Sequence, residues 1–103
     1  METLTKEQKM QVAINIYNQI GKGAMYMIGA KNFGYDKDSL SFKIGRNQKR
    51  VTHIKITLTV WDTYTMEFFN CGKDITLKSK KKNIYNDQLN EMIESETGLI
   101  THL

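Results

Sequence analysis

The middle of the chain alternates between apolar and polar residues with a period of two. The alternation runs over 39–44, over 51–60 and again from Tyr64 through Phe68. This is the period of a β-strand that turns one face to the core and the other to solvent. The pattern therefore predicts three antiparallel strands, the last two of them joined by a tight connection at 61–63.

Two shorter apolar segments add to the predicted sheet. Residues 24–28 form a continuous apolar run between glycines, which favours a short and largely buried strand. Ile75 and Leu77 follow a turn at 70–73 and indicate a final strand, which leads into the basic stretch 78–82. The sheet should thus contain four to five strands.

Helical spacing marks both ends of the chain. The first helix is predicted over about 5–20, with Thr5 and Gln8 as a capping box and Gly21 as the stop. The second begins near Tyr85 and ends at Gly98, with Leu99 placed for a contact beyond the helix end. The apolar positions that define these two helices are Met10, Ala13, Ile14, Tyr17 and Ile20, then Tyr85, Leu89, Met92 and Ile93.

One apolar face on the sheet and one apolar stripe on each helix predict a two-layer α+β domain over residues 1–103. Its order is an N-terminal helix, an antiparallel meander and a C-terminal helix, with both helices on one sheet face. The opposite face stays open to solvent or to a partner, and a solvated polar face is ordinary for such a sheet. It carries Ser41, Lys43, His53, Lys55, Thr57, Thr59, Thr65 and Glu67.

The residue counts narrow the class of protein. With 103 residues, 40% of them apolar and 25% charged, the composition is that of one ordinary globular domain. Cys71 is the only cysteine, so no intramolecular disulfide forms and a reducing compartment is favoured. The first residues lack a signal-peptide pattern and no long apolar run follows. We therefore expect a cytoplasmic protein without a membrane partner.

Charge is distributed unevenly along the chain. The formal net charge is +4. Residues 43–82 carry ten basic and three acidic residues, whereas residues 83–103 carry four acidic and no basic ones. Residues 43–82 therefore carry a net charge of +7, whereas residues 83–103, with the terminal helix, carry a net charge of −4.

The basic residues predict a nucleic-acid interface, because such a patch neutralises phosphates. The predicted contacts are Lys43, Arg46, Lys49, Arg50 and Lys55 on the 45–50 hairpin and its flanks, and Lys78, Lys80, Lys81 and Lys82 beyond the last strand. Aromatic side chains on the open side would add stacking surfaces. The alternative is that these lysines keep the protein soluble and shield sheet edges from pairing.

Catalytic and metal-binding motifs are weak, so we expect no enzyme activity, no metal and no cofactor. His53 and His102 lack ligand-spaced neighbours, and Cys71 has no histidine near it in sequence. A hydrolase or nuclease would require scattered residues to converge in space. Those residues are His53, Asp62, Glu67, Cys71 and Asp74.

Several phrases of the sequence resemble a family of small uncharacterised proteins encoded by bacteriophages and mobile elements of gut bacteria. They are Gly29-Ala30-Lys31-Asn32-Phe33, Leu40-Ser41-Phe42-Lys43-Ile44, Ile54-Lys55-Ile56-Thr57-Leu58, Asp62-Thr63-Tyr64, Asp87-Gln88-Leu89, Thr97-Gly98-Leu99 and Thr101-His102-Leu103. The resemblance covers the chain from about residue 16 onward. It implies a small accessory protein of the bacterial cytoplasm and brings no functional residue with it.

Two functions follow as hypotheses. In the first, the protein binds DNA or RNA through the basic hairpin and the sheet face. In the second, it is a protein-binding inhibitor of a bacterial defence system, of the anti-defence or anti-CRISPR type, that docks on a host protein through one of its charged ends. An uncapped edge strand leaves assembly into a homo-oligomer open in either case.

Overall fold

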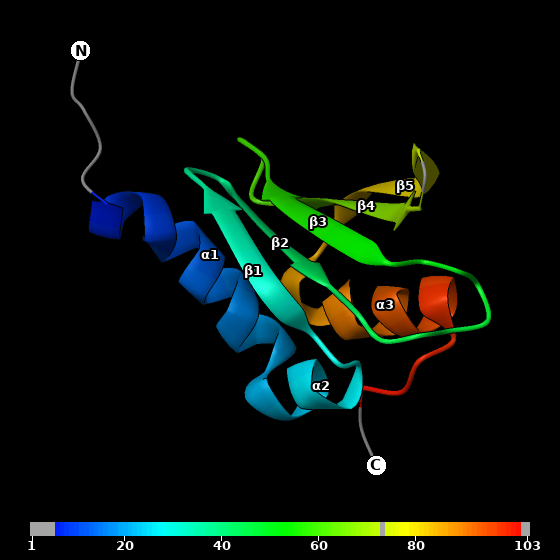
Figure 1. Cartoon of the computed structure of the whole chain (residues 1–103). Helices are drawn as coiled ribbons and strands as arrows, with labels where there is room; N and C mark the ends of the chain where they lie inside the picture. Colours follow the sequence, from blue (N-terminus) through cyan, green and yellow to red (C-terminus); the bar gives the residue numbers. More distant parts are fainter. Residues whose placement is uncertain (1–5, 73, 102–103) are drawn as a thin grey trace.

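The computed structural model of the chain describes residues 6–72 and 74–101 (Figure 1). The elements in chain order are α1 (Lys6–Ile20), α2 (Lys22–Met27), β1 (Lys31–Asp36), β2 (Ser39–Lys43), β3 (His53–Leu58), β4 (Tyr64–Cys71), β5 (Ile75–Ile84), a 3-10 turn (Asn86–Gln88) and α3 (Leu89–Thr97). The five strands pair antiparallel in the order β1-β2-β3-β4-β5, so the predicted meander is confirmed.

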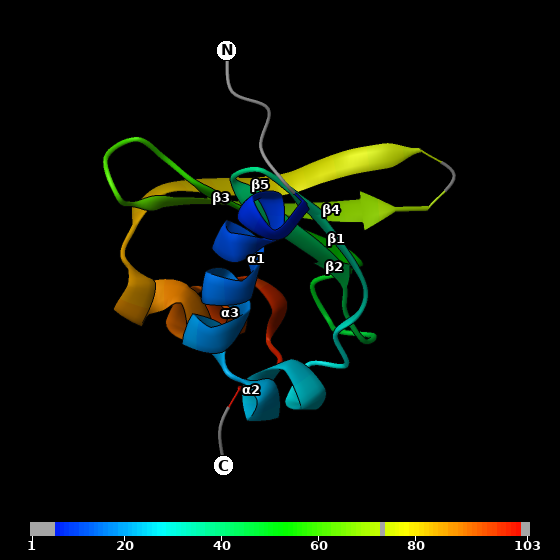
Figure 2. The same cartoon turned by 90° about the vertical axis from the view of Figure 1, so that its left-hand side faces the viewer.

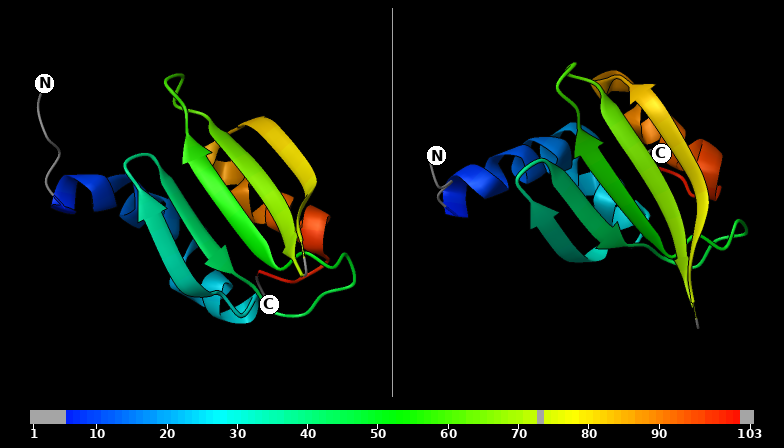
Figure 3. Two further views of the ribbon diagram at one scale, coloured as in Figure 1. Left: turned by 45° about the horizontal axis from the view of Figure 1, so that its top comes forward. Right: turned by 90° about the horizontal axis from the view of Figure 1, so that it is seen from above.

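The helices lie together on one face of the sheet, as predicted. Figure 2 shows the sheet as an upper layer with α1, α2 and α3 beneath it, and Figure 3 shows the uncovered face in front of the helices. The core fills the space between the two layers. Its fully buried side chains include Ile16 and Ile28 from the helical part, Phe42, Ile54, Ile56, Met66 and Phe68 from the sheet, and Leu89 and Ile93 from α3.

Strand register separates the two faces. Phe42, Ile54 and Phe68 lie side by side across β2, β3 and β4, and all three are buried. The neighbouring row carries Ser41, Lys55 and Glu67, and it points to the uncovered side. The alternation in the sequence therefore predicts correctly which residues of these strands face the core and which face the uncovered side.

The segment 24–28 is helical, so the strand predicted there is wrong. Met25 donates its N–H to the carbonyl of Gly21 at 3.0 Å, and Ile28 donates to Ala24 at 3.1 Å. Alanine and methionine favour a helix, and a short apolar run does not by itself distinguish a buried helix from a strand. Gly21 has φ of 97°, which turns the chain between α1 and α2.

The strand β1 does not appear in the sequence pattern. A bulge separates its pairing at Lys31 from its pairing at Gly34, and Asn32 adopts φ of 55°. The bulge breaks the two-residue period and β1 lies at the sheet edge, so the strand carries no regular alternation.

The ends of β3 and β5 also differ from the predicted strand ends. β5 continues through the basic stretch to Ile84, and β3 ends at Leu58. The stop at Gly98 is confirmed, because this residue has φ of 78° and donates its N–H to the carbonyl of Glu94. The predicted cap at Thr5 lies outside the described residues.

Candidate nucleic-acid interface

The loop between β2 and β3 is organised by one side-chain amide. Asn47 donates through Nδ2 to the carbonyls of Gly45 at 3.0 Å and Val51 at 2.6 Å, and its Oδ1 accepts the N–H of Val51 at 3.1 Å. Ile44 and Thr52 close the base of the loop with a backbone hydrogen bond of 2.9 Å. Because these bonds tie the two sides of the loop together, its charged side chains project from a fixed backbone.

A cleft of about 360 Å³ opens beside this loop. Three of its lining residues are cationic, Lys43, Arg46 and Arg50, and none is acidic. The remaining lining residues are Ile44, Gly45, Asn47, Val51, Thr52 and Asn70. The cleft therefore combines positive charge with amide and hydroxyl donors.

The strand β4 fixes the far wall of the cleft. Asn70 donates through Nδ2 to the carbonyl of Arg50 at 2.8 Å. Thr52 donates its N–H to the carbonyl of Phe69 at 2.8 Å, and its Oγ1 accepts the N–H of Cys71 at 2.8 Å. These contacts join segments that are about twenty residues apart in sequence, so the loop is held as a part of the sheet.

The near wall depends on a close approach between two glycines. Gly45 donates its N–H to the carbonyl of Ile28 at 2.8 Å. Gly29 has φ of +70°, and a Cβ placed on it would lie 3.2 Å from the nitrogen of Gly45. The turn after α2 can therefore pack this closely against the basic loop because Gly29 has no side chain, whereas a Cβ on Gly45 would make an ordinary contact of 3.4 Å with the carbonyl oxygen of Ile28.

The open sheet face continues the basic surface away from the cleft. Lys43, His53 and Phe69 are neighbours across β2, β3 and β4, with Lys31 and Leu77 at the two ends of the same row. In the next row Glu67 pairs with Lys55 on one side and with Lys80 on the other. The face thus carries cations together with a partly exposed aromatic ring.

The structure divides the predicted basic residues into two groups. Lys43, Arg46 and Arg50 share the cleft, while Lys55 and Lys80 lie on the open face. Exposed Lys82 lies two residues beyond Lys80 in β5.

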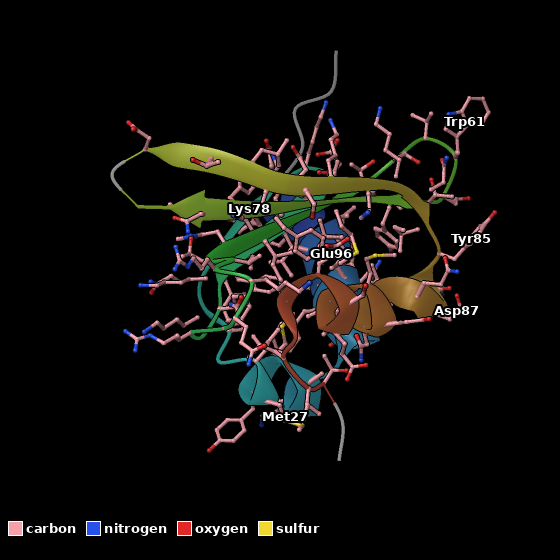
Figure 4. The ribbon with its side chains drawn as sticks, turned by 90° about the vertical axis from the view of Figure 1, so that its right-hand side faces the viewer. Met27, Trp61, Lys78, Tyr85, Asp87 and Glu96 are labelled. Atoms are coloured by element: carbon pink, nitrogen blue, oxygen red, sulfur yellow. The ribbon has the colours of Figure 1, made fainter. Side chains whose placement is uncertain are left out.

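The other basic residues lie on the side of α3. Lys49 and Lys78 line a small hollow of about 120 Å³ with Glu96, and Lys81 forms a salt bridge of 3.1 Å to the same carboxylate. Figure 4 shows Lys78 on β5 and Glu96 on α3 in the layer beneath it. An acidic residue thus balances part of this second group.

The residues considered for catalysis do not all meet, because His53 lies opposite Phe69, the β4 residue midway between Glu67 and Cys71, whereas the two aspartates are separated. Asp62 precedes β4 and Asp74 follows it, so the two carboxylates belong to opposite ends of this strand. His53 accepts or donates a 2.8 Å hydrogen bond with Thr52 through Nδ1. Across residues 6–72 and 74–101, no three His, Cys, Asp or Glu side chains gather in an arrangement that holds a metal. His102 lies outside this range.

Sequence reasoning identified the cations but missed the neutral residues that place them. Asn47, Thr52 and Asn70 carry no charge and follow no period. The partners of Thr52 and Asn70 are distant in sequence, whereas those of Asn47 lie within four residues. A loop asparagine between two strands is a weak signal for such a role.

Among the described residues, no helix combines the length and apolar character needed to cross a bilayer.

Comparison with known proteins identifies no relative of this chain. No protein-family model matches the chain, and neither a curated protein nor a solved structure shows significant similarity to it. The fold and the cleft therefore define it as a small α+β domain with a basic loop and an uncovered sheet face.

Proposed function

We propose that the protein binds nucleic acid through the cleft of the β2–β3 loop and the adjoining open sheet face. The observation that carries the proposal is the gathering of Lys43, Arg46 and Arg50 around one cleft whose lining contains no carboxylate. Guanidinium and ammonium groups beside amide donors form the kind of surface that contacts phosphate oxygens. Such contacts position a strand without reading its sequence.

The open face supplies a surface for bases next to the phosphate contacts. Phe69 is partly exposed there and is flanked across the sheet by His53 and Leu77. Stacking on such rings is sequence-tolerant, because every base has a π-face. A strand whose phosphates enter the cleft would therefore find apolar contacts in the Phe69 row.

Charge also sets the side on which a polyanion would lie. The helical layer carries Asp87, Glu91 and Glu96. By contrast, the cations Lys43, Arg46 and Arg50 line the cleft, and Lys55 and Lys80 lie on the open face. In Figure 4 the labelled Asp87 and Glu96 lie in the layer below the sheet. Repulsion from this layer favours binding on the uncovered side.

Fluorescence anisotropy with single-stranded and duplex oligonucleotides at low salt tests the proposal. The double variant Arg46→Gln/Arg50→Gln should weaken binding about tenfold or more, which corresponds to about 1.4 kcal/mol. The matched control is Lys22→Gln/Lys37→Gln, which removes the same charge from exposed positions on α2 and the β1–β2 turn. Absence of binding by the unaltered protein, or equal losses in both double variants, would refute it.

A second candidate function is that of a protein-binding inhibitor of a bacterial defence system. It is favoured by the β3–β4 turn, where Val60 is 91% exposed and Trp61 is 81% exposed. Hydrogen bonds hold the backbone of this turn, since the hydroxyls of Thr59 and Thr63 lie 2.9 Å apart and Trp61 donates its backbone N–H to Thr59 Oγ1 at 3.2 Å. Tryptophan is enriched among the residues that anchor protein interfaces.

The test of this second function is a pull-down from bacterial lysate treated with nuclease. Recovery of a defined protein by the unaltered chain, and its loss with Trp61→Ala, would support the inhibitor. Recovery that disappears on nuclease treatment would instead show that captured proteins were held through nucleic acid.

A further inference from the structure

An apolar patch lies on the open sheet face beside the basic cleft. It consists of two neighbouring cross-strand pairs, Phe69 with Leu77 and Cys71 with Ile75. Ile75 is 77% exposed and Leu77 is 47% exposed, while Phe69 and Cys71 are partly exposed. Figure 3 shows β4 and β5, the two strands that carry the patch, side by side. A contiguous apolar group on an otherwise polar sheet face marks a contact surface.

Two hydrogen bonds join the patch to the wall of the cleft. Asn70, which lies between Phe69 and Cys71, donates through Nδ2 to the carbonyl of Arg50 at 2.8 Å. The N–H of Cys71 donates to Thr52 Oγ1, also at 2.8 Å. Because Asn70 and Thr52 both line the cleft, the apolar patch and the cations of the cleft belong to one surface.

A histidine stands between the patch and the cleft. His53 is the cross-strand neighbour of Lys43 on one side and of Phe69 on the other. Thr52 Oγ1 lies 2.8 Å from Nδ1 of His53 and 3.3 Å from the carbonyl oxygen of Phe69. Nδ1 is thereby occupied, and Nε2 is the ring nitrogen that remains for a ligand. The row therefore passes from a cation to an aromatic ring without a carboxylate.

We propose that this surface binds single-stranded nucleic acid, with its phosphates in the cleft and its bases on the apolar patch. The inference rests on the nucleic-acid binding proposed above and names the substrate class. Unstacked bases are recognised by stacking on aromatic side chains, and the stacking tolerates any sequence. Cations on one side of an apolar patch are the complement of a strand that has phosphates on one side and bases on the other.

A duplex does not fit this surface, because its base faces are hidden inside the stack. Its major groove is about 12 Å wide and admits an α-helix or a two-stranded ribbon. Five strands spaced about 4.8 Å apart span about 19 Å, so the whole sheet does not enter the groove. A duplex held by the cleft would therefore leave Phe69 and Leu77 without bases to contact.

Charge alone would give the opposite preference. A duplex carries one phosphate charge per about 1.7 Å of its length, whereas one of its strands carries one per about 3.4 Å. A surface that acted only through Lys43, Arg46 and Arg50 would bind a duplex at least as tightly as a single strand. Tighter binding of the single strand therefore measures what the apolar patch contributes.

Fluorescence anisotropy at low salt tests the substrate class with three probes. They are oligothymidine, oligouridine, and oligothymidine annealed to oligodeoxyadenosine. The unaltered protein should bind at least one of the single strands about tenfold more tightly than the duplex, because each stacked base adds to the binding free energy.

Phe69→Leu isolates the aromatic ring while keeping an apolar side chain. It should weaken single-strand binding about tenfold through the loss of stacking, and it should change duplex binding by less than about twofold. The matched control is Tyr26→Leu, which removes an aromatic ring that is 87% exposed on α2. This control should change none of the three affinities. Circular dichroism shows whether both variants are folded.

Cys71 provides a second measurement that needs no substitution. It is the only cysteine of the chain, it is free, and it lies in the patch. Saturating oligothymidine should slow the alkylation of Cys71 by iodoacetamide severalfold, because the bases cover the thiol. Inorganic polyphosphate, which carries charge without bases, should leave the rate of alkylation nearly unchanged.

The outcomes separate this inference from the proposed function. Duplex binding as tight as single-strand binding, or single-strand binding that Arg46→Gln/Arg50→Gln weakens and Phe69→Leu does not, would overturn the single-strand surface. Alkylation of Cys71 at the same rate with and without saturating oligothymidine would overturn it as well. In these cases nucleic-acid binding by the cleft would stand. Absence of binding to all three probes would overturn both proposals.

Discussion

At the scale of single residues, the basic loop depends on a neutral side chain. Asn47 makes three hydrogen bonds that span the loop, and two of them involve Val51, whose side chain is buried. Among the cations that define the cleft, Arg50 takes part through its backbone, donating its N–H to the carbonyl of Asn47 at 3.2 Å and accepting from Asn70. Their positions therefore follow from a residue that does not itself carry charge.

Asn47→Ala should lower the free energy of unfolding by about 1–3 kcal/mol, because partly buried carbonyl and N–H groups lose their partner. It should also weaken oligonucleotide binding, since Arg46 and Arg50 lose their fixed backbone. Urea denaturation and anisotropy measure the two effects. Gln48→Ala, at the exposed neighbour, should change stability by less than about 0.5 kcal/mol.

Gly29 and Gly23 provide a matched pair of alanine substitutions. Gly29→Ala should cost about 1–2 kcal/mol, because a left-handed φ is unfavourable for alanine and the new Cβ would press on Gly45. Gly23→Ala should stabilise the protein by about 0.4–1 kcal/mol, because Gly23 lies in α2 and its Cβ position is free of neighbours. Thermal denaturation shows whether each variant is more or less stable than the unaltered protein. Equal changes in melting temperature for the two variants would contradict these predictions.

At the scale of elements, α3 is held to the sheet by its apolar stripe. Leu89 and Ile93 are fully buried, while Glu91 is exposed on the other side of the helix. The salt bridge between Lys81 and Glu96 joins exposed or partly exposed groups and adds little, about 0.2–1 kcal/mol. Burial of apolar side chains therefore dominates the attachment.

Ile93→Ala should destabilise the protein by about 2–5 kcal/mol, through lost burial and the cavity that remains. Glu91→Ala serves as the control on the same helix and should change stability by less than about 0.5 kcal/mol. Chemical denaturation followed by circular dichroism provides the comparison. A small effect of Ile93→Ala would show that α3 packs loosely.

The elements that the sequence predicted correctly are those with a strict period. β2, β3 and β4 alternate because one face is buried, and α1 and α3 carry one apolar stripe each. α2 was misread because its apolar residues form a continuous run without a period, and β1 was missed because its bulge breaks the alternation. The cations of the cleft were found by charge, whereas Asn70 takes part only because the fold brings β4 to the loop.

At the scale of the whole molecule, the charge asymmetry of the sequence becomes an asymmetry between layers. The cleft with Lys43, Arg46 and Arg50 lies at the sheet, and the acidic residues of α3 lie in the layer beneath it. The salt bridge of Lys81 draws part of the basic stretch toward α3. The net charge of +4 is thus a poor measure of the field near the cleft.

Salt dependence tests this arrangement. For the proposed complex, the logarithm of the binding constant should fall linearly with the logarithm of salt concentration. Arg46→Gln/Arg50→Gln should reduce the slope by about 1.4–1.8, because two phosphate contacts are lost and each releases about 0.7–0.9 counterions. An unchanged slope would place the phosphate contacts elsewhere on the protein.

The meander has a consequence for the rate at which the protein reaches its native state. Every strand pairs with its neighbour in sequence, so most loops that close during folding are short. The docking of α3 against α1 is the distant exception, with Asn90 donating to the carbonyl of Ile20 at 3.0 Å. The sequence contains no proline, which removes the isomerisation step that delays many refolding reactions by tens of seconds. Refolding of dilute protein from urea should therefore be fast and free of such a slow phase, with closure of the two terminal helices as its last long-range event.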